Sequence, residues 1–339
     1  MEKRILKAAI IGCGAISKNH VMALAEGDYA KIVALCDIDI ARAEERAEVA
    51  TEAALYTDWR VKLDEAKPDV VHICTPHYLH VEMACECLER GINVYLEKPV
   101  AISHEELCHL EDVAAKSKAK ITVSFQNRRI APNHLFISLV EAEGGAKAAR
   151  GMVTWNRGED YYTADDWHGV LAREGGGLMI NQAIHNLDML LCAFPDDEIV
   201  SVRGNSDLWY NAPFSEVEDN ANFIVTFASG KRIVFFGTND YATTAPIFYE
   251  VTTASGKRIT GMDGKIFKNG EKMEFLEEDL KMDGKNCWGY GHRICIREFY
   301  EAIVNDTEVP VSLATAARTM RVIFALYRSH GKDFYLTDL

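Results

Sequence analysis

The sequence predicts an α/β protein with two domains. Residues 1–125 are expected to form a doubly wound parallel sheet, and residues 126–339 an α/β domain with a mainly antiparallel open sheet. Three observations predict this arrangement. Strand and helix patterns alternate as far as residue 125, a glycine-rich turn opens that series, and alternating strands without a second such turn follow it. A chain of 339 residues, 48% of them apolar, is long enough for two cores.

The first strand, Ile5–Ile11, ends in a glycine turn, and Lys18–Ala25 has the pattern of a helix. A strand, glycine turn and helix in this order let backbone N–H groups and a helix N-terminus hold a pyrophosphate. Ser17 replaces the third glycine usual in such turns and is still small enough for close helix packing. The residues expected to contact a dinucleotide here are Gly12, Gly14, Ala15 and Ile16.

The second strand, Lys31–Cys36, ends in Asp37, about 20 residues after the glycine turn. A carboxylate at that point can accept hydrogen bonds from the hydroxyls of an adenosine ribose, and it would repel a 2′-phosphate. The sequence therefore favours NAD over NADP. The alternative is that Asp37 only caps a loop.

Later elements continue the alternation. They are helix Asp39–Ala50, strand Val70–Cys74, helix Tyr78–Arg90, strand Asn93–Leu96, helix His104–Lys118 and strand Ile121–Phe125. Because ligands bind at the carboxyl ends of parallel strands, the candidates for cofactor contacts are Thr75, Pro76, Glu97, Lys98 and Asn127. His80 could face either the cofactor or the core.

Lys98 stands in the triplet Glu97-Lys98-Pro99, where the proline ends a buried strand. A lysine half sunk in a crevice can have its pKa lowered enough to exchange protons near neutrality. The alternative is a solvated Glu-Lys surface pair.

The second half contains strand patterns at Ala148–Trp155, Ile199–Asn205, Ala221–Phe227, Lys231–Thr238 and Ile247–Thr253. Two late helices, Cys295–Val304 and Leu313–Ser329, are expected to pack on the assembly. Asp263–Asp279 has the composition of a polar hairpin or loop.

The segment from Gly175 to Leu190 carries two helical stripes. One is apolar and consists of Ile180, Ile184, Leu187 and Leu191. The other places Asn181, His185 and Asp188 on one side of the helix. The three glycines before it allow a close approach to the N-terminus of the helix. His185 is a candidate acid/base residue or, alternatively, a satisfied structural histidine.

Between the first strand of this half and the glycines lie Trp155, Tyr162 and Trp167, which suit a sugar-binding rim. The alternative, ordinary core packing, explains at least half of the residues in this stretch. Arg128 could hold a phosphate or carboxylate of a substrate, or pair with an acid of the chain.

Five segments in this order resemble the glucose-fructose oxidoreductase, inositol 2-dehydrogenase and MocA family (Gfo/Idh/MocA). They are GCGAIS, CTPHYLH, EKP, QNRR and GGGLMINQAIHNLD. The resemblance implies a Rossmann domain, an open-sheet α/β domain, a tightly held nicotinamide cofactor, and a sugar, inositol or similar polyol as substrate. Lys98 matches the lysine that contacts the reacting hydroxyl, and His185 the acid/base histidine.

Asn181 departs from the family pattern, because many members carry an aspartate there. Asp188 is a candidate for the missing carboxylate. In the predicted mechanism His185 accepts the hydroxyl proton, Lys98 stabilises the developing alkoxide, and Asn181 binds the substrate. The site is expected to be complete only when both domains contribute.

Two other functions remain open within the same family. An NAD-dependent glycosidase would oxidise and re-reduce the sugar in one turnover and release no NADH. A non-enzymatic regulatory protein would bind NAD and a sugar without turnover.

The formal net charge of −14 argues against nucleic acid or an anionic membrane as a partner. The nine cysteines lack metal-binding spacing, and no metal requirement is expected. No signal peptide or membrane span is evident, which predicts a cytoplasmic protein. An exposed sheet face in the second domain would favour a homodimer or homotetramer.

Overall fold

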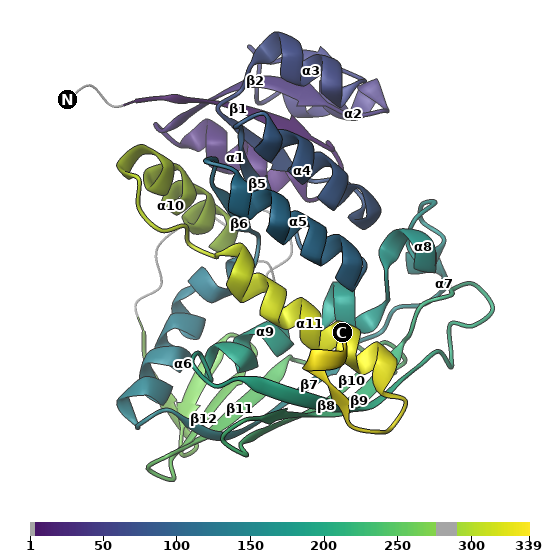
Figure 1. The fold of residues 1–339 in the computed structure, drawn as a ribbon, viewed down its shortest axis with the longest axis vertical. Coiled ribbons are helices and arrows are strands. Elements are labelled where there is room, and N and C mark those ends of the chain that lie inside the picture. The colour runs from purple at the N-terminus through teal and green to yellow at the C-terminus, as the bar shows by residue number, and fades with distance from the viewer. Residues whose placement is uncertain (1–3, 276–289) are drawn as a thin grey trace. The chain divides into compact units, whose positions relative to one another are not determined.

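The computed structural model describes residues 4–275 and 290–339, whose helices and strands are drawn in Figure 1. The chain folds into two compact units. Within the described residues, the first unit consists of residues 4–101, 105–126 and 290–316, and the second of residues 102–104, 127–275 and 317–339. A late segment of the chain, residues 290–316, thus belongs to the first unit. The predicted division at residue 125 assigns this segment to the second domain.

The first unit is built on a six-stranded parallel sheet in the order β3-β2-β1-β4-β5-β6. Its strands are β1 (Leu6–Ile11), β2 (Ala30–Cys36), β3 (Ala54–Tyr56), β4 (Val70–Ile73), β5 (Asn93–Leu96) and β6 (Ile121–Val123). Its helices are α1 (Ser17–Glu26), α2 (Ile40–Ala47), α3 (Trp59–Ala66), η1 (His77–Leu79), α4 (His80–Glu89), α5 (His104–Lys116) and α10 (Gly291–Asn305). The strand order is that of a doubly wound dinucleotide-binding fold, so the predicted fold class is confirmed.

The central strands of this sheet are short apolar runs because helices cover both faces. All four residues of β4 are buried, and one of them is His72. The sequence prediction missed β3 and α3, which are three and eight residues long.

The second unit contains a nine-stranded sheet in the order β14-β13-β12-β11-β7-β10-β9-β8-β15. Within the described part of the chain, β7 and β10 pair in parallel, and all other neighbours in this sheet are antiparallel. The strands are β7 (Ala146–Thr154), β8 (Ile199–Asp207), β9 (Asn220–Phe227), β10 (Arg232–Thr238), β11 (Phe248–Thr253), β12 (Arg258–Met262), β13 (Lys265–Lys268), β14 (Glu271–Met273) and β15 (Phe334–Tyr335). The predicted open and mainly antiparallel sheet is therefore confirmed.

The helical segments of this unit lie between and after these strands. They are η2 (Gln126–Arg129), α6 (Ala131–Ala142), α7 (Glu159–Tyr162), α8 (Leu171–Glu174), η3 (Leu178–Gln182), α9 (Ile184–Cys192), α11 (Leu313–Ser329) and η4 (Leu336–Asp338). Part of η2 and of α11 belongs to the first unit. The predicted hairpin after residue 263 is present as β13 and β14, and residues 276–279 of that prediction lie outside the described residues.

Helices α6 and α9 pack on one face of the sheet (Figure 1). Gly151 on β7 permits the close approach of α9, since a Cβ at this position would lie 2.6 Å from Leu190 Cδ1. The opposite face carries a row of apolar side chains in register across four strands, from β10 through β7 and β11 to β12. This row, called the outer apolar row below, consists of Phe236, Met152, Phe248 and Met262.

The predicted helix through Asn181 and His185 is divided into two pieces. Residues Leu178–Gln182 form a π-helical turn, closed by a hydrogen bond of 2.8 Å from Ala183 N to Leu178 O, and α9 starts at Ile184. None of the helices in residues 4–275 and 290–339 is long and apolar enough to cross a membrane.

Candidate active site

The glycine turn follows β1 in the first unit. Gly12 has a φ of +86°, and a Cβ there would lie 2.5 Å from Cys74 O, so any other residue would be strained and would clash. Around Gly14 the described residues place no atom within 4 Å of a Cβ position, which leaves this side of the turn open. Helix α1 starts at Ser17, and among the described residues no side chain caps its N-terminus. Its first N–H groups can therefore bind an anion.

Ala15 and Ile16 lie between this turn and α1, with Ala15 exposed and Ile16 half-buried. They stay candidates for cofactor contacts.

Asp37 braces the same turn. Its Oδ2 accepts a hydrogen bond of 2.7 Å from Cys13 N, and its Oδ1 accepts one of 2.9 Å from Asp39 N. The carboxylate thus ties the end of β2 to the glycine turn, at the position where the sequence placed a ribose-binding group.

Arg46 is a cation beside the glycine turn that the sequence did not reveal. Its Nε donates to Ser17 Oγ at 3.0 Å, and its Nη2 donates to Gly14 O at 3.2 Å. Arg46 lies on α2, and no motif links it to the turn, which explains why sequence reasoning missed it.

His80 lies in the core and not on an open surface. Its Nδ1 is 2.7 Å from Pro99 O and its Nε2 is 3.0 Å from Thr75 O. Burial lowers the pKa of His80, against the effect of these two carbonyl groups. His80 therefore holds the half-buried Thr75-Pro76 segment to the loop after β5, which is the core alternative that the sequence left open.

Glu97 is buried, with 4% of its surface exposed. Its Oε1 lies 2.9 Å from His20 Nε2 and 3.3 Å from His292 Nε2, and its Oε2 accepts a hydrogen bond of 3.3 Å from Lys98 N. Burial tends to raise the pKa of Glu97, but the hydrogen bonds from both imidazoles outweigh it, and the pKa lies well below the usual range. Lys98 itself is half-buried and precedes the cis-proline Pro99.

His20, Glu97 and His292 also have the composition of a metal site. Their donor atoms lie within 4.8 Å of one another, and among the described residues no other such group occurs.

In the second unit Asn181 is fixed by two neighbours. Its Nδ2 donates to Tyr161 Oη at 3.0 Å and to Glu174 Oε1 at 2.8 Å. Because a carboxylate only accepts hydrogen bonds, the NH₂ group of Asn181 must face Glu174. Gln182 Nε2 donates to the same tyrosine hydroxyl at 2.8 Å. Glu174 is completely buried, and its Oε2 accepts a hydrogen bond of 2.6 Å from Gly169 N.

His185 lies half-buried in the first turn of α9. The predicted apolar stripe is buried, as expected for the packed side of the helix: Ile180, Ile184, Leu187 and Leu191.

The expectation that Asp188 supplies a carboxylate to His185 is not supported. Asp188 forms a two-pronged ion pair with Arg128, at 2.7 Å to Nε and 2.6 Å to Nη2, and accepts a hydrogen bond of 2.8 Å from Thr319 Oγ1. Arg128 is thus paired with an acid of the chain, which is one of the two roles that the sequence predicted for it. The buried carboxylate near Asn181 is Glu174, which no sequence pattern marked.

Asn127 holds the start of α6, because its carbonyl oxygen accepts a hydrogen bond of 2.7 Å from Asn133 Nδ2. Among the described residues its own Oδ1 is buried without a hydrogen-bond partner. A cofactor contact by Asn127 stays a prediction.

The predicted aromatic residues have different environments. The guanidinium of Arg157 lies 4.8 Å from the Trp155 ring, and Trp167 packs on His168 with ring centroids 3.7 Å apart. Tyr162 is buried, and its hydroxyl accepts a hydrogen bond of 3.1 Å from Asn239 Nδ2. Tyr162 is therefore part of the core as well as a wall of a pocket.

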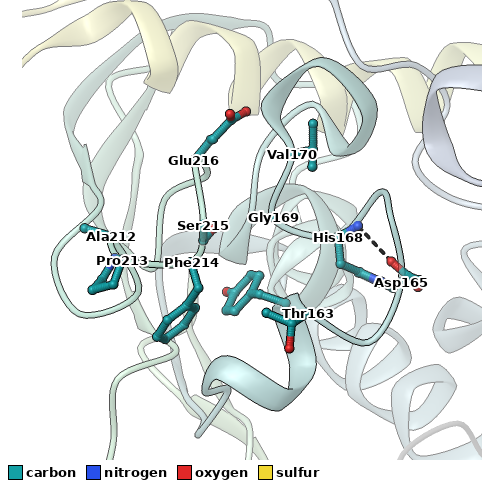
Figure 2. Close-up of a pocket in the computed structure, with 11 residues that line it drawn as sticks. Thr163, Asp165, His168, Gly169, Val170, Ala212, Pro213, Phe214, Ser215 and Glu216 are labelled. Atoms are coloured by element: carbon teal, nitrogen blue, oxygen red, sulfur yellow. Dashed lines mark hydrogen bonds and ion pairs between the residues drawn. The ribbon is translucent and has the colours of Figure 1, made fainter.

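This pocket, of about 480 Å³, lies between the segment after α7 and the loop before β9 (Figure 2). In Figure 2 the imidazole of His168 points at the carboxylate of Asp165, 2.8 Å away. Of the residues that the sequence proposed for substrate contacts, Tyr162 alone lines it. The full lining is Tyr162, Thr163, Asp165, His168, Gly169, Val170, Ala212, Pro213, Phe214, Ser215 and Glu216.

Comparison with known families finds two matches along the chain. Residues 6–125 match the oxidoreductase family with an NAD-binding Rossmann fold, and residues 142–259 match the GFO/IDH/MocA C-terminal domain.

Among similar proteins, D-glucoside 3-dehydrogenase of Escherichia coli is 29% identical, with 97% of this chain and 96% of that protein covered. Inositol 2-dehydrogenase of Rhizobium meliloti is 25% identical over 68% of this chain and 67% of its own length. A crystal structure of the WlbA dehydrogenase from Chromobactrium violaceum, in complex with NADH and UDP-GlcNAcA, superimposes with a TM-score of 0.85. It is 25% identical and covers 99% of this chain and 97% of its own.

Proposed function

Since this chain belongs to the Gfo/Idh/MocA family and is an NAD(P)-dependent oxidoreductase, we propose that it oxidises a secondary alcohol of a sugar, inositol or related polyol, or reduces the matching ketone. The named relatives act on substrates of this class, as their names state.

The observation that carries the proposal is the fixed orientation of Asn181 one helical turn before His185. Its NH₂ group is held by Tyr161 and Glu174, so its carbonyl oxygen is turned to the other side. An amide held in this way can accept a hydrogen bond from a substrate hydroxyl at little entropic cost. Polyols are recognised through such fixed polar groups.

We assign the proton transfer to His185. Oxidation removes a hydride from carbon and a proton from oxygen, and the nicotinamide, when bound, takes the hydride. His185 accepts the proton of the hydroxyl, and the Lys98 ammonium stabilises the negative charge that develops on the oxygen. In ketone reduction His185 returns the proton.

We further propose that the cofactor is NAD in preference to NADP. Asp37 carries a negative charge at the end of β2, and its carboxylate would repel a 2′-phosphate. Arg46 lies beside the glycine turn, and its positive charge would weaken this preference by attracting a 2′-phosphate. Titration of intrinsic fluorescence should give tighter binding of NADH than of NADPH in the native protein and a smaller difference in Asp37→Ala. Equal affinities in the native protein would contradict the assignment.

The outer apolar row leads us to propose a homodimer or homotetramer. Phe236 and Met152 are 45% and 41% exposed, although they adjoin on neighbouring strands. Contiguous apolar surface of this kind marks interaction sites. We expect Phe236→Asp to convert the oligomer to a smaller species in light scattering. Val304→Asp, a change at an exposed apolar residue on α10, should leave the mass unchanged. A monomeric native protein would refute the proposal.

The function is tested by following NADH absorbance with a panel of sugars, inositols, their keto forms and sugar phosphates. We expect NADH formation with at least one alcohol. Sugar release from a glycoside without net NADH would instead indicate the glycosidase, and binding without any turnover the regulatory protein.

A further inference from the structure

A chain of buried polar side chains ends at Glu97 in the first unit. It connects α1, β4, the end of β5 and α10, elements far apart in the sequence. Each of its residues is 4% exposed or less: His20, His72, Glu97, His292 and Tyr300.

The contacts run in sequence from Tyr300 to Glu97. Tyr300 Oη lies 3.0 Å from His72 Nε2, His72 Nδ1 lies 2.8 Å from His20 Nδ1, and His20 Nε2 lies 2.9 Å from Glu97 Oε1. His292 reaches the same carboxylate oxygen from α10 at 3.3 Å.

The chemistry of these groups fixes the direction of the hydrogen bonds. A carboxylate only accepts, so His20 donates from Nε2 to Glu97. Burial lowers the pKa of His20 and of His72, which favours the neutral form of both rings. The Nδ1 of a neutral His20 is then an acceptor, His72 donates from its Nδ1, and Tyr300 donates to His72 Nε2. Every donor in the chain points toward Glu97.

Glu97 also faces other titratable groups. Besides Lys98, the described residues that interact with its charge include Cys74, His80 and Tyr95, in addition to His20, His72 and His292. Burial raises the pKa of Cys74 and of Tyr95 well above the usual values, so neither is charged at pH 7. Glu97 is thus a single carboxylate held ionised by donated hydrogen bonds, and its second oxygen accepts the backbone N–H of Lys98.

We propose that Glu97, with the chain from Tyr300 through His72 and His20, is a positioning device for Lys98. The inference rests on the proposed role of Lys98 in the reaction. The carboxylate holds the Lys98 peptide in place and provides a fixed negative charge beside it, which favours the ammonium form of the lysine. Removal of the Tyr300 hydroxyl takes away the first donor of the chain, so His72 and then His20 can change tautomer. The effect reaches Lys98 through the three hydrogen bonds that remain, which join His72 to His20, His20 to Glu97, and Glu97 to the Lys98 N–H.

Two variants and one matched control test this. Glu97→Gln keeps the size of the side chain and removes its charge, and should lower kcat by about 10-fold or more, the factor for one pKa unit of lost charge stabilisation. Tyr300→Phe should lower kcat by about 3- to 10-fold, the factor for one ordinary hydrogen bond. KM and the NADH dissociation constant should stay near their native values in both. Tyr29→Phe is the control, because its ring lies 5.1 Å from that of Tyr300 but its hydroxyl donates to Ala23 O.

A second measurement does not depend on activity or on a folded variant. Spectra of the native protein labelled with ¹⁵N-histidine should show a neutral His20 protonated at Nε2 and a neutral His72 protonated at Nδ1. The opposite tautomers would overturn the proposal. So would a stoichiometric metal ion in the purified protein, because a metal on His20 and His292 would need the lone pairs that the hydrogen bonds exclude.

Lys98→Met distinguishes a failure of the proposed reaction from a failure of the positioning device. If this variant keeps native kcat, the assigned role of Lys98 is wrong and the inference fails with it. If Lys98→Met is inactive while Glu97→Gln and Tyr300→Phe keep native kcat, the inference alone is wrong.

Discussion

Replacement of His185 by alanine should lower kcat by about 10²- to 10⁴-fold, the usual contribution of a general acid or base. The affinity for NADH should not change, because His185 belongs to the second unit and the glycine turn, Asp37 and α1 belong to the first. Stopped-flow or steady-state kinetics at saturating substrate measure the effect directly. His109→Ala is a suitable control, since His109 is an exposed histidine on α5.

The opposite assignment, with Lys98 as the base and His185 as a positioning group, predicts different kinetic effects of the two variants. If Lys98 is the base, His185→Ala retains near-native kcat with a raised KM, and Lys98→Met is inactive across the pH range. That result would overturn the assignment of His185 as proton acceptor.

Lys62→Met should stabilise the protein by roughly 3 to 4 kcal/mol at pH 7. Lys62 on α3 is completely buried, and among the described residues its Nζ has no hydrogen-bond partner. Burial lowers its pKa from 10.5 to about 8, and each unit of the shift corresponds to about 1.4 kcal/mol. Methionine has a similar length and carries no charge, so it removes the cost of the buried ammonium.

The stabilising effect of Lys62→Met should depend on pH in a defined direction. The pKa of Lys62 is lower in the folded protein than in the unfolded chain. The buried ammonium therefore costs its full free energy of folding below about pH 8, and this cost disappears as the pH rises from about 8 to 10.5. Urea denaturation at pH 7 and at pH 10 should therefore give a large difference between variant and native protein at the lower pH and a smaller one at the higher. Lys116→Met, at an exposed position on α5, should show no such trend. A destabilised Lys62→Met protein at pH 7 would contradict the expectation.

The fold was predictable because its signals are local. The glycine turn and the apolar runs of β1 and β4 each specify their structure over a few residues. The short strand β3 and helix α3 escaped prediction because three- and eight-residue segments carry too little periodicity.

The candidate site was predictable only in part. Asn181 and His185 could be found because they share one helical stripe. Glu174 could not, because it reaches Asn181 from a separate short helix through a hydrogen bond that no spacing encodes. The contacts of Glu97 with His20 and His292 join positions 77 and 195 residues apart, so they arise from tertiary packing alone. Asp188 shows the same limit, because its partner Arg128 is 60 residues away.

The central claim, hydride transfer between a polyol carbon and the nicotinamide, is tested most directly with a substrate deuterated at the reacting carbon. The panel screen supplies the substrate, and mass spectrometry of the cofactor after a single turnover gives the result. We predict one deuterium in the NADH formed by the native protein and none with His185→Ala in the same time. Product formation without deuterium in the cofactor would contradict the proposed reaction.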